Sequence, residues 1–389
     1  MPVKILVRYG EIALKGKNRG QFEQRLHQNL KAAVKGLSAE VVRLRGRFTV
    51  SGPDEYLDQM LESVSRVFGV VSISTVRETE LDFDRIKGMA AEIVSRIFPE
   101  LKTFKIVARR SNKKFPYPSP EINKLLGAHL QQLYPALEVN LHQPAFTLAV
   151  EIGFDTAFLY LDRTAGPGGL PVGITGRSLL LLSGGIDSPA AGWLAMKRGL
   201  SVEALHFHSY PFTSKRSQAK AVDLSRKLAL YSGKIPLHMI NVAGIQKELR
   251  SQCPEELGII LLRRMMLRLA SLVSEERGLQ VLVTGENLGQ VASQTLESIN
   301  VISKATGMLI LRPLLSMDKR EIIDLARRID TYDTSILPYE DCCTLFVPKN
   351  PTTKPKIEIV ERVETRLDIA KMLEEAIGSL ETTIVKRFV

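Results

Sequence analysis

The stretch Leu181-Leu182-Ser183-Gly184-Gly185-Ile186-Asp187-Ser188-Pro189 joins an apolar run, Ser178–Leu182, to a segment with helical periodicity. Small residues let the backbone of such a loop approach a phosphate closely, and a helix N-terminus offers unpaired N–H groups and a positive dipole end. Proline fits the first helical turn, where its missing N–H is not needed. The stretch therefore predicts a phosphate-binding loop between a buried strand and a helix.

Two common nucleotide-binding patterns are absent. The loop is not the GxxxxGK(S/T) pattern that cradles β- and γ-phosphates, and no GxGxxG fingerprint occurs, so a dinucleotide-dependent dehydrogenase is disfavoured. The alternative to a functional loop is a chance glycine-rich turn after a strand. The strand–loop–helix context argues against that alternative.

Strands and helices alternate in the part of the chain that follows residue 175. Asp318, with Glu321 three residues later, has the pattern of a capping box at a helix start. We expect strands at 178–182, 202–207, 237–242, 281–284 and 309–311, and helices at 189–197, 215–231, 258–276 and 290–297. This alternation with apolar strands predicts an α/β fold with a doubly wound parallel sheet.

The first 164 residues have the pattern of two small α+β units. The expected strands are 4–8, 41–51, 70–76, 104–109, 146–152 and 157–161, and the expected helices are 18–36, 54–68, 82–98 and 121–133. Residues 165–173 contain four Gly and two Pro, a composition typical of a linker. We therefore expect domains at 1–53, 54–164 and 175–389, with a linker at 165–174.

The charge balance points to a polyanionic partner. The 389 residues include 53 Lys and Arg against 42 Asp and Glu, a net charge of +11, and residues 101–120 hold six basic and no acidic residues. Cations that neutralise phosphates favour binding to nucleic acid, although a basic surface also serves solubility. Phe115 and Tyr117 stack on unpaired bases or pack beneath a basic loop, and the sequence leaves both interpretations open. The candidate RNA-binding residues are Arg109, Arg110, Lys113 and Lys114.

Hydropathy and cysteine content narrow the class of protein. No stretch approaches the roughly 20 uncharged apolar residues of a membrane span. The start of the chain lacks a signal-peptide pattern, so we expect a cytoplasmic protein without a membrane partner. The three cysteines, Cys253, Cys342 and Cys343, include no CxxC pair. A disulfide scaffold and a structural zinc site are therefore disfavoured, and we name no metal-ligating residues.

The segment Ser183-Gly184-Gly185-Ile186-Asp187-Ser188 resembles the PP-loop of the ATP pyrophosphatase family. That resemblance implies cleavage of ATP between the α- and β-phosphates, with adenylation of the substrate. Further motifs from both halves of the chain are Arg8–Gly16, Arg263–Met266, Thr284–Thr295, Arg312–Leu314 and Pro338–Cys343. Together they make nearly the whole chain similar to the tRNA 4-thiouridine synthetases, also called tRNA uridine 4-sulfurtransferases.

This resemblance implies an enzyme with a ferredoxin-like domain, a THUMP domain that helps bind tRNA, and a PP-loop catalytic domain. It implies ATP and Mg²⁺ as cofactors, tRNA as partner and 4-thiouridine as product. A uracil carbonyl oxygen is a poor leaving group. Adenylation converts it into a good leaving group, which sulfur then displaces as AMP. A second implied task is the transfer of sulfur to a carrier protein for the thiazole of thiamine.

The resemblance assigns Asp187 and Lys319 to adenylation, with Asp187 helping to hold Mg²⁺ and Lys319 offsetting phosphate charge. The ATP contacts that it implies are Leu181, Leu182, Ser183, Gly184, Gly185, Ser188, His206, Phe207, Arg263, Gly285 and Gln294. Some have plainer interpretations: the two leucines suit a core strand, and either Arg263 or Arg264 suits a solvated helix face. Asp318 is expected to be a helix cap. Lys319 then opposes the helix dipole, which favours a function for it.

The adjacent cysteines are the candidates for sulfur transfer. The family carries a cysteine here that attacks a persulfide, and an ungapped count from Lys319 favours Cys342 over Cys343. Two buried small side chains are the alternative, and adjacent cysteines are poor ligands for an iron–sulfur cluster. No cysteine follows Cys343, so the expected sulfur donor is a separate rhodanese or a cysteine desulfurase.

Two other functions fit the chain less well. A PP-loop ligase or amidotransferase acting on a small molecule would not need the basic N-terminal half. A non-catalytic tRNA-binding protein would not need the phosphate loop. The sequence leaves a homodimer open.

Overall fold

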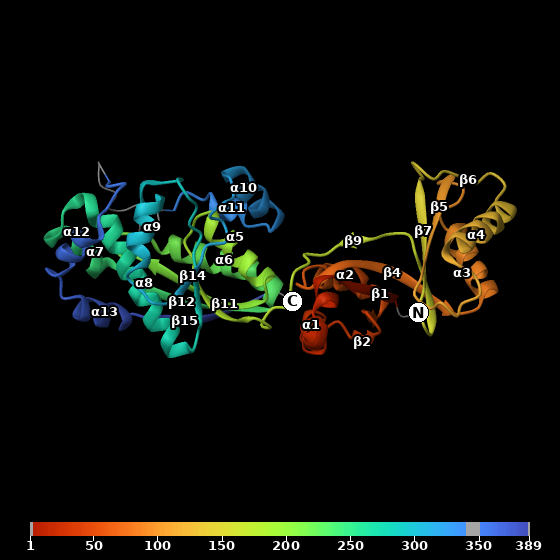
Figure 1. Cartoon of the computed structure of the whole chain (residues 1–389), viewed down its shortest axis with the longest axis horizontal. Helices are drawn as coiled ribbons and strands as arrows, with labels where there is room; N and C mark the ends of the chain where they lie inside the picture. Colours follow the sequence, from red (N-terminus) through yellow and green to blue (C-terminus); the bar gives the residue numbers. More distant parts are fainter. Residues whose placement is uncertain (1–2, 340–350, 388–389) are drawn as a thin grey trace. The chain divides into compact units, whose positions relative to one another are not determined.

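The computed structural model describes residues 3–339 and 351–387. The chain forms two compact units: residues 1–19 with 30–168, and residues 20–29 with 169–389. We call them the N-terminal unit and the C-terminal unit. Figure 1 colours their elements along the sequence.

A mixed sheet runs through the N-terminal unit in the order β2-β3-β1-β4-β8-β7-β5-β6, with β9 beside β4. The long strand β4 joins its two halves, because β4 pairs with β1 through Val70–Val76 and with β8 through Arg77–Glu80. The strands are β1 (Val3–Tyr9), β2 (Glu40–Leu44), β3 (Arg47–Gly52), β4 (Val70–Glu80), β5 (Thr103–Arg110), β6 (Glu138–Val139), β7 (Phe146–Ile152), β8 (Thr156–Tyr160) and β9 (Thr164–Ala165). Helices in this part of the chain are α1 (Arg19–Ala33), α2 (Leu57–Ser65), α3 (Phe83–Ser95) and α4 (Ser119–Leu133).

Helices α3 and α4 lie side by side, as Figure 1 shows. Each buries an i, i+4 stripe: Ile86, Ala90 and Val94 on α3, and Ile122, Leu126 and Leu130 on α4. These stripes share one core with Phe104 and Ile106 of β5 and Leu148 and Val150 of β7. Burial along these two helices therefore follows the helical period.

Two details of this unit differ from the sequence-based expectation. Segment 41–51 was expected to be one strand, but it is the antiparallel hairpin β2–β3, turned at Gly46 with a φ of +80°. A positive φ suits glycine, and periodicity alone does not reveal such a turn. Helix α2 packs on β4, and the first half of β4 pairs with β1, whereas the expectation had placed residue 54 at the start of a second domain.

The C-terminal unit holds a sheet in the order β14-β13-β10-β11-β12-β15, in which all neighbours are parallel except β12 and β15. Its strands are β10 (Gly176–Leu181), β11 (Leu200–His208), β12 (Lys234–Asn241), β13 (Val281–Val283), β14 (Leu309–Leu311) and β15 (Glu381–Lys386). Its helices are α5 (Asp187–Lys197), α6 (Lys215–Ser232), α7 (Ala243–Gln252), α8 (Gly258–Arg277), α9 (Leu296–Ser303), α10 (Lys319–Arg328), α11 (Tyr332–Ser335), α12 (Ile357–Glu364) and α13 (Ile369–Ile377). The expected doubly wound parallel sheet is confirmed, with one antiparallel edge strand.

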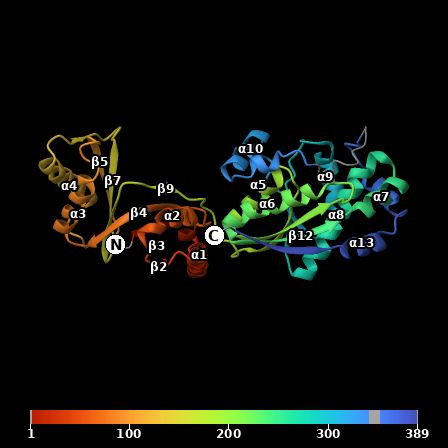
Figure 2. The same ribbon diagram turned by 180° about the vertical axis from the view of Figure 1, so that it is seen from behind.

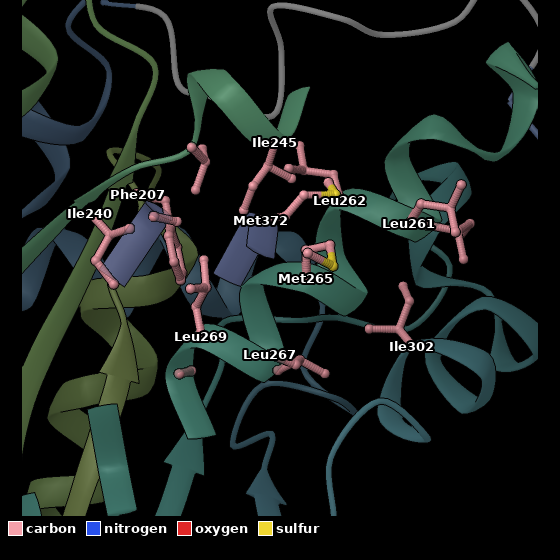
Figure 3. Packing of buried hydrophobic residues seen from close by; sticks show 14 of the residues in the cluster. Phe207, Ile240, Ile245, Leu261, Leu262, Met265, Leu267, Leu269, Ile302 and Met372 are labelled. Atoms are coloured by element: carbon pink, nitrogen blue, oxygen red, sulfur yellow. The ribbon is translucent and has the colours of Figure 1, made fainter. Parts of the chain in front are cut away.

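Two groups of helices cover the sheet. Helices α5 and α6 pack on one face with α10 and α11, while α7, α8, α9 and α13 pack together on the other (Figure 2). Figure 3 shows the core of the second face, where Phe207 and Ile240 of the sheet meet Met265 and Leu269 of α8 and Met372 of α13. This packing fixes the position of α8 against the sheet.

The sequence misplaced one helix of this unit and did not reveal several others. Residues 290–297 were expected to be helical, but only a single 3-10 turn forms at Ala292–Gln294. Helix α9 starts later because the Thr295 side chain caps it by accepting a hydrogen bond from the Ser298 amide. Helices α7, α12 and α13 and strand β15 were not anticipated. The capping box at Asp318 and Glu321 is confirmed.

Candidate active site

The phosphate loop between β10 and α5 is closed by its own serines. The Ser188 hydroxyl accepts a hydrogen bond from the Ser183 amide (3.0 Å) and donates one to the Ser183 carbonyl (3.1 Å). The Ser183 hydroxyl accepts one from the Gly185 amide (3.3 Å). Because α5 begins at Asp187, its N-terminus lies directly behind this turn. A closed turn at a helix N-terminus is an arrangement that binds anions.

The loop lies at the switch point of the parallel sheet. The chain adds β11 and β12 on one side of β10 and then places β13 on the other side. In such sheets, ligands bind beyond the carboxyl ends of the strands where the order reverses. At this point a Cβ on Gly285, just after β13, would lie 2.7 Å from the Ser188 amide nitrogen. Glycine at 285 therefore lets the loop after β13 approach the phosphate loop.

A cavity opens at this switch point. Its apolar lining is Leu181, Leu182, Leu205, Phe207, Met266, Leu267 and Ile302. Its remaining lining is Ser183, Gly185, Asp187, Ser188, Arg263, Thr284, Gly285, Glu286 and Gln294. An apolar wall beside an anion-binding loop fits a nucleotide, because a base and a phosphate chain need these two environments.

Two of the predicted ATP contacts do not line the cavity. His206 is buried, and its Nδ1 lies 2.9 Å from the Leu182 carbonyl oxygen, so that the ring supports the strand before the loop. Gly184 belongs to the loop but packs against the side chain of Lys220 on α6. The structure brings the other predicted contacts together around the cavity.

Arg263 reaches the cavity from α8 and is held by a buried carboxylate. Glu286 forms an ion pair with Arg263 (2.9 Å) and a second with Arg312 (2.5 Å), and it accepts a hydrogen bond from Thr284. Burial alone would raise the pKa of Glu286, but the two guanidinium groups outweigh it and hold that pKa below its usual value. The Ser293 hydroxyl accepts a further hydrogen bond from Arg263. The guanidinium is thus preorganised at the cavity wall.

Asp187 and Lys319 meet at the loop although 131 residues separate them in the chain. The Lys319 ammonium lies 2.8 Å from Asp187 Oδ1. With its side-chain amide turned to match these charges, Gln290 completes the group: the amide nitrogen then lies 3.2 Å from Asp187 Oδ2 and the amide oxygen 2.6 Å from Lys319 Nζ. The pairing places a carboxylate, an ammonium and an oriented amide together beside the phosphate loop.

Sequence reasoning missed Glu286, Gln290 and Lys220 as site residues. The first two lie inside the motif Thr284–Thr295, in which the resemblance implies only Gly285 and Gln294 as ATP contacts. No sequence signal marks Lys220, which lies mid-helix between polar and apolar neighbours. Its proximity to the loop depends on the packing of α6 beside α5.

A second cavity lies within the N-terminal unit and is strongly basic. Its lining includes four arginines and one glutamate: Arg8, Arg47, Arg109, Arg163 and Glu151. Glu151 pairs with Arg8 at 2.7 Å and also with Arg47. Burial would raise the pKa of Glu151, but Arg8, the Tyr160 hydroxyl and Arg47 bring it below its usual value. The excess of cations over carboxylates makes this cavity suitable for phosphate groups.

The basic side chains of the loop after β5 differ in their environment. Arg110 donates to the Phe115 carbonyl (2.9 Å) and so holds the loop, whereas Lys113 and Lys114 are exposed. Phe115 is buried in the core of this half, and the Tyr117 ring packs 4.7 Å from that of Phe83, measured between centroids. Of the two interpretations of these aromatics, packing beneath the loop is therefore the one observed.

Profiles of known families match three segments of the chain. Residues 173–369 match the family described as thiamine biosynthesis protein (ThiI), residues 4–74 the ThiI ferredoxin-like domain, and residues 80–162 the THUMP domain. A probable tRNA sulfurtransferase from Moorella thermoacetica is 49% identical over 387 residues, which cover 99% of this chain and 98% of that protein. The chain belongs to the tRNA sulfurtransferase family. A further member, from Brevibacillus brevis, is 46% identical over 380 residues, with 97% and 95% covered.

Solved structures agree with membership of the tRNA sulfurtransferase family. A crystal structure described as a 4-thiouridine synthetase–RNA complex with bound ATP is 38% identical, with a TM-score of 0.90 and coverage of 99% of this chain and 100% of that one. The protein PH1313 from Pyrococcus horikoshii Ot3 shares the fold at 23% identity, with a TM-score of 0.65 and coverage of 84% and 99%. The expected family and the combination of fold types are thereby confirmed.

The two cysteines predicted to act in this sulfurtransferase, Cys342 and Cys343, lie outside the described residues. Cys253 is a free, half-buried thiol, and burial raises its pKa. A raised pKa disfavours the thiolate that sulfur transfer requires. Cys253 is therefore poorly suited to sulfur transfer.

Within residues 3–339 and 351–387, no group of three or more His, Cys, Asp or Glu side chains is arranged to hold a metal ion. Among the same residues, no helix is long and apolar enough to cross a membrane.

Proposed function

We propose that this protein uses ATP to activate a uridine in tRNA and replaces the uridine 4-oxygen with sulfur, forming 4-thiouridine. The observation that carries the proposal is the phosphate loop at the switch point, with Asp187 and Lys319 meeting beside it. Full-length likeness to tRNA sulfurtransferases supports the reaction class. The related 4-thiouridine synthetase, described with RNA and bound ATP, supports both substrates.

The cavity residues divide the binding of ATP between them. The adenine fits against Leu181, Leu182 and Phe207, and the phosphates fit the N–H groups of the loop. Arg263, fixed by Glu286, offsets negative charge on the phosphate chain. His206 and Gly184 contribute through the backbone that they position.

The donor set at Asp187 fits Mg²⁺. Mg²⁺ at nucleotide sites is held by one or two carboxylates together with phosphate oxygens, and Asp187 supplies one such carboxylate on the cavity wall. The ion would neutralise charge on the departing pyrophosphate. Lys319 and Gln290 hold the Asp187 carboxylate in place.

The proposed reaction consists of adenylation, displacement of AMP by sulfur, and release of the sulfur donor. The uridine O4 attacks the α-phosphorus, the bond between the α- and β-phosphates breaks, and the N3 proton is released with pyrophosphate. The terminal sulfur of a protein persulfide then attacks C4, and the C4–O4 bond breaks to release AMP. Cys342 attacks the donor's sulfur to form a disulfide and leaves the second sulfur on C4; Cys343 is the second choice. A thiol reductant reopens the disulfide.

The sulfur donor is proposed to be a separate rhodanese or a cysteine desulfurase, and the enzyme is proposed to act as a homodimer in the cytoplasm, where it would meet its tRNA. The match to the family described as thiamine biosynthesis protein favours a second task, sulfur transfer to a carrier protein for the thiazole. This task would use the same adenylation chemistry on a carboxylate instead of a uracil.

The proposed RNA surface centres on the basic cavity of the N-terminal unit. Arg109, an original candidate, lines that cavity with Arg8, Arg47 and Arg163. Exposed Lys113 and Lys114 extend the positive charge along the adjoining loop. Arg110 also supports the loop, through its hydrogen bond to the Phe115 carbonyl. These groups serve the phosphate backbone, which dominates the affinity of proteins for nucleic acid.

One reaction tests the function. Unmodified tRNA is incubated with the enzyme, Mg-ATP and a persulfide-bearing rhodanese, and AMP and 4-thiouridine are measured in the same samples by chromatography and nucleoside mass spectrometry. We expect tRNA-dependent AMP and 4-thiouridine to appear together and both to be lost in Asp187→Asn, which should still bind tRNA. Failure of the unaltered enzyme to produce either would refute the proposal.

A further inference from the structure

The basic cavity of the N-terminal unit contains a buried carboxylate among its arginines. Glu151, on β7, lines this cavity although only 7% of its surface is exposed. A carboxylate repels the phosphate groups that the surrounding arginines attract, so it does not serve as an RNA contact itself. Its presence in the cavity is explained by the side chains that it holds.

Glu151 accepts hydrogen bonds from two arginines on distant strands. Arg8 of β1 donates to Oε1 at 2.8 Å, and Arg47 of β3 donates to Oε2. In the sheet, β1 and β3 lie on the opposite side of β4 from β7, so the carboxylate links the two halves of the sheet. Both arginines belong to the segment that matches the ferredoxin-like domain, whereas Glu151 belongs to the THUMP segment.

Further contacts fix the carboxylate and Arg8. The Tyr160 hydroxyl, on β8, donates to Glu151 Oε1 at 2.7 Å. Burial and the neighbouring Glu151 raise the pKa of Tyr160 to about 12, so the hydroxyl stays protonated and remains a donor. The Arg8 guanidinium lies 4.6 Å from the centre of the Tyr160 ring and donates to the Ser74 hydroxyl at 3.0 Å. Arg8 is therefore held at the cavity wall in one orientation.

Arginines held in this way can still bind phosphate. A guanidinium group carries more N–H donors than these contacts use, and its fork matches the oxygens of a phosphate group. Without the carboxylate, the like charges of Arg8 and Arg47 would repel each other, and both side chains would have to be ordered when RNA binds. Glu151 thus lowers the positive charge of the cavity but fixes the arginines that line it.

We propose that Glu151 is a positioning residue, which holds Arg8 and Arg47 in the orientation in which they contact the phosphate backbone of tRNA. The inference rests on the proposed function, which makes tRNA the substrate. The ferredoxin-like and THUMP segments then build this phosphate site together, because the arginines come from one segment and the carboxylate from the other. A residue that served only as a counter-charge would have the opposite effect on tRNA affinity when neutralised.

The test compares Glu151→Gln with a matched control, Glu78→Gln. Glutamine keeps the size of the side chain and removes the negative charge. Glu78, on β4 of the same unit, pairs with Lys4 and is not among the residues that line the cavity. Dissociation constants for unmodified tRNA are measured by fluorescence anisotropy at one salt concentration, without ATP or a sulfur donor. Circular dichroism shows whether each variant is folded.

We expect Glu151→Gln to weaken tRNA binding by about tenfold, although it makes the protein more positive. Glu78→Gln, with the same change in charge, should leave the affinity unchanged or at most about twofold tighter. In a background that carries Arg8→Met and Arg47→Met, Glu151→Gln should change the affinity by less than about twofold, because the side chains through which it acts are gone. Unchanged or tighter binding by Glu151→Gln alone would overturn the inference, as would a tenfold loss that persists in the methionine background.

Tyr160→Phe tests the same inference without changing any charge. It keeps the ring beside Arg8 but removes one hydrogen bond to Glu151, so tRNA binding should weaken by about threefold, and this loss should vanish in the methionine background. If Glu151→Gln does not fold, this variant decides, and an unchanged affinity would overturn the inference. Because these assays contain neither ATP nor a sulfur donor, a failure to form 4-thiouridine would count against the proposed function alone.

Discussion

Glu364 offers a quantitative test of how the active-site helix is held in place. Its carboxylate lies on α12, is buried, and receives four hydrogen bonds of 2.7–2.9 Å from Arg264 and Arg268 of α8. Burial raises the pKa of Glu364, but the hydrogen bonds from the two arginines outweigh it and bring that pKa from 4.5 to about 2. Helix α8 also carries Arg263, so this network anchors the cavity wall.

The lowered pKa converts into stability with a definite sign. A carboxyl group that is more acidic in the folded state stabilises it above the unfolded pKa of 4.5, and this contribution is lost as pH falls towards 2. The difference corresponds to about 3 kcal/mol of unfolding free energy at pH 7. Glu364→Gln should therefore destabilise the C-terminal unit by about 3 kcal/mol at pH 7 and by progressively less below pH 4.5.

Urea unfolding followed by Trp193 fluorescence measures this effect. Trp193 is the single tryptophan of the chain, is buried on α5, and so reports on the C-terminal unit. Glu361→Gln, an exposed position one turn earlier on α12, is the matched control and should change stability by less than about 0.5 kcal/mol. A gap between Glu364→Gln and the unaltered protein that stays constant from pH 7 to pH 3 would refute the reasoning.

Three further predictions concern the reaction and its substrates. Gln290→Leu should lower kcat for AMP formation about tenfold with little change in KM for ATP, because the amide orients Asp187 and Lys319; an unchanged kcat would contradict this. Replacing Arg109 and Arg163 together by Met should weaken tRNA binding and reduce the slope of log affinity against log salt by about 2, with ATP binding unaffected; an unchanged slope would show that neither meets a phosphate. Cys342→Ser should still form AMP with tRNA but no 4-thiouridine from a protein persulfide, while Cys343→Ser does less damage; the reverse result would transfer the role to Cys343.

The local features of the site followed from the sequence because they depend on neighbouring residues. The loop Ser183–Ser188 sits between a strand and a helix as predicted, since glycine content and an apolar run act over a few residues. Asp318 caps α10 as predicted, and Lys319 then points its charge at Asp187. The order of alternating strands and helices was also sufficient to predict the parallel sheet.

Other features required the tertiary structure because their partners are distant in the chain. The sequence did not distinguish Arg263 from Arg264. In the structure Arg263 faces the cavity and pairs with Glu286, whereas Arg264 is buried against Glu364, 100 residues away. Which strands pair was equally undetermined, so β4 was assigned to one half of the N-terminal sheet although it joins both.

The sequence by itself determined that this protein has a phosphate loop and a doubly wound sheet. Its motifs also determined that it resembles the tRNA sulfurtransferases. Only the tertiary structure decided that Gln290 bridges Asp187 and Lys319, that Glu286 aims Arg263, and that Lys220 lies beneath the loop. Periodicity records which side chains leave water, because burial repeats with the helix or strand period. It does not record which buried charge meets which, because that depends on how elements far apart in the chain pack together.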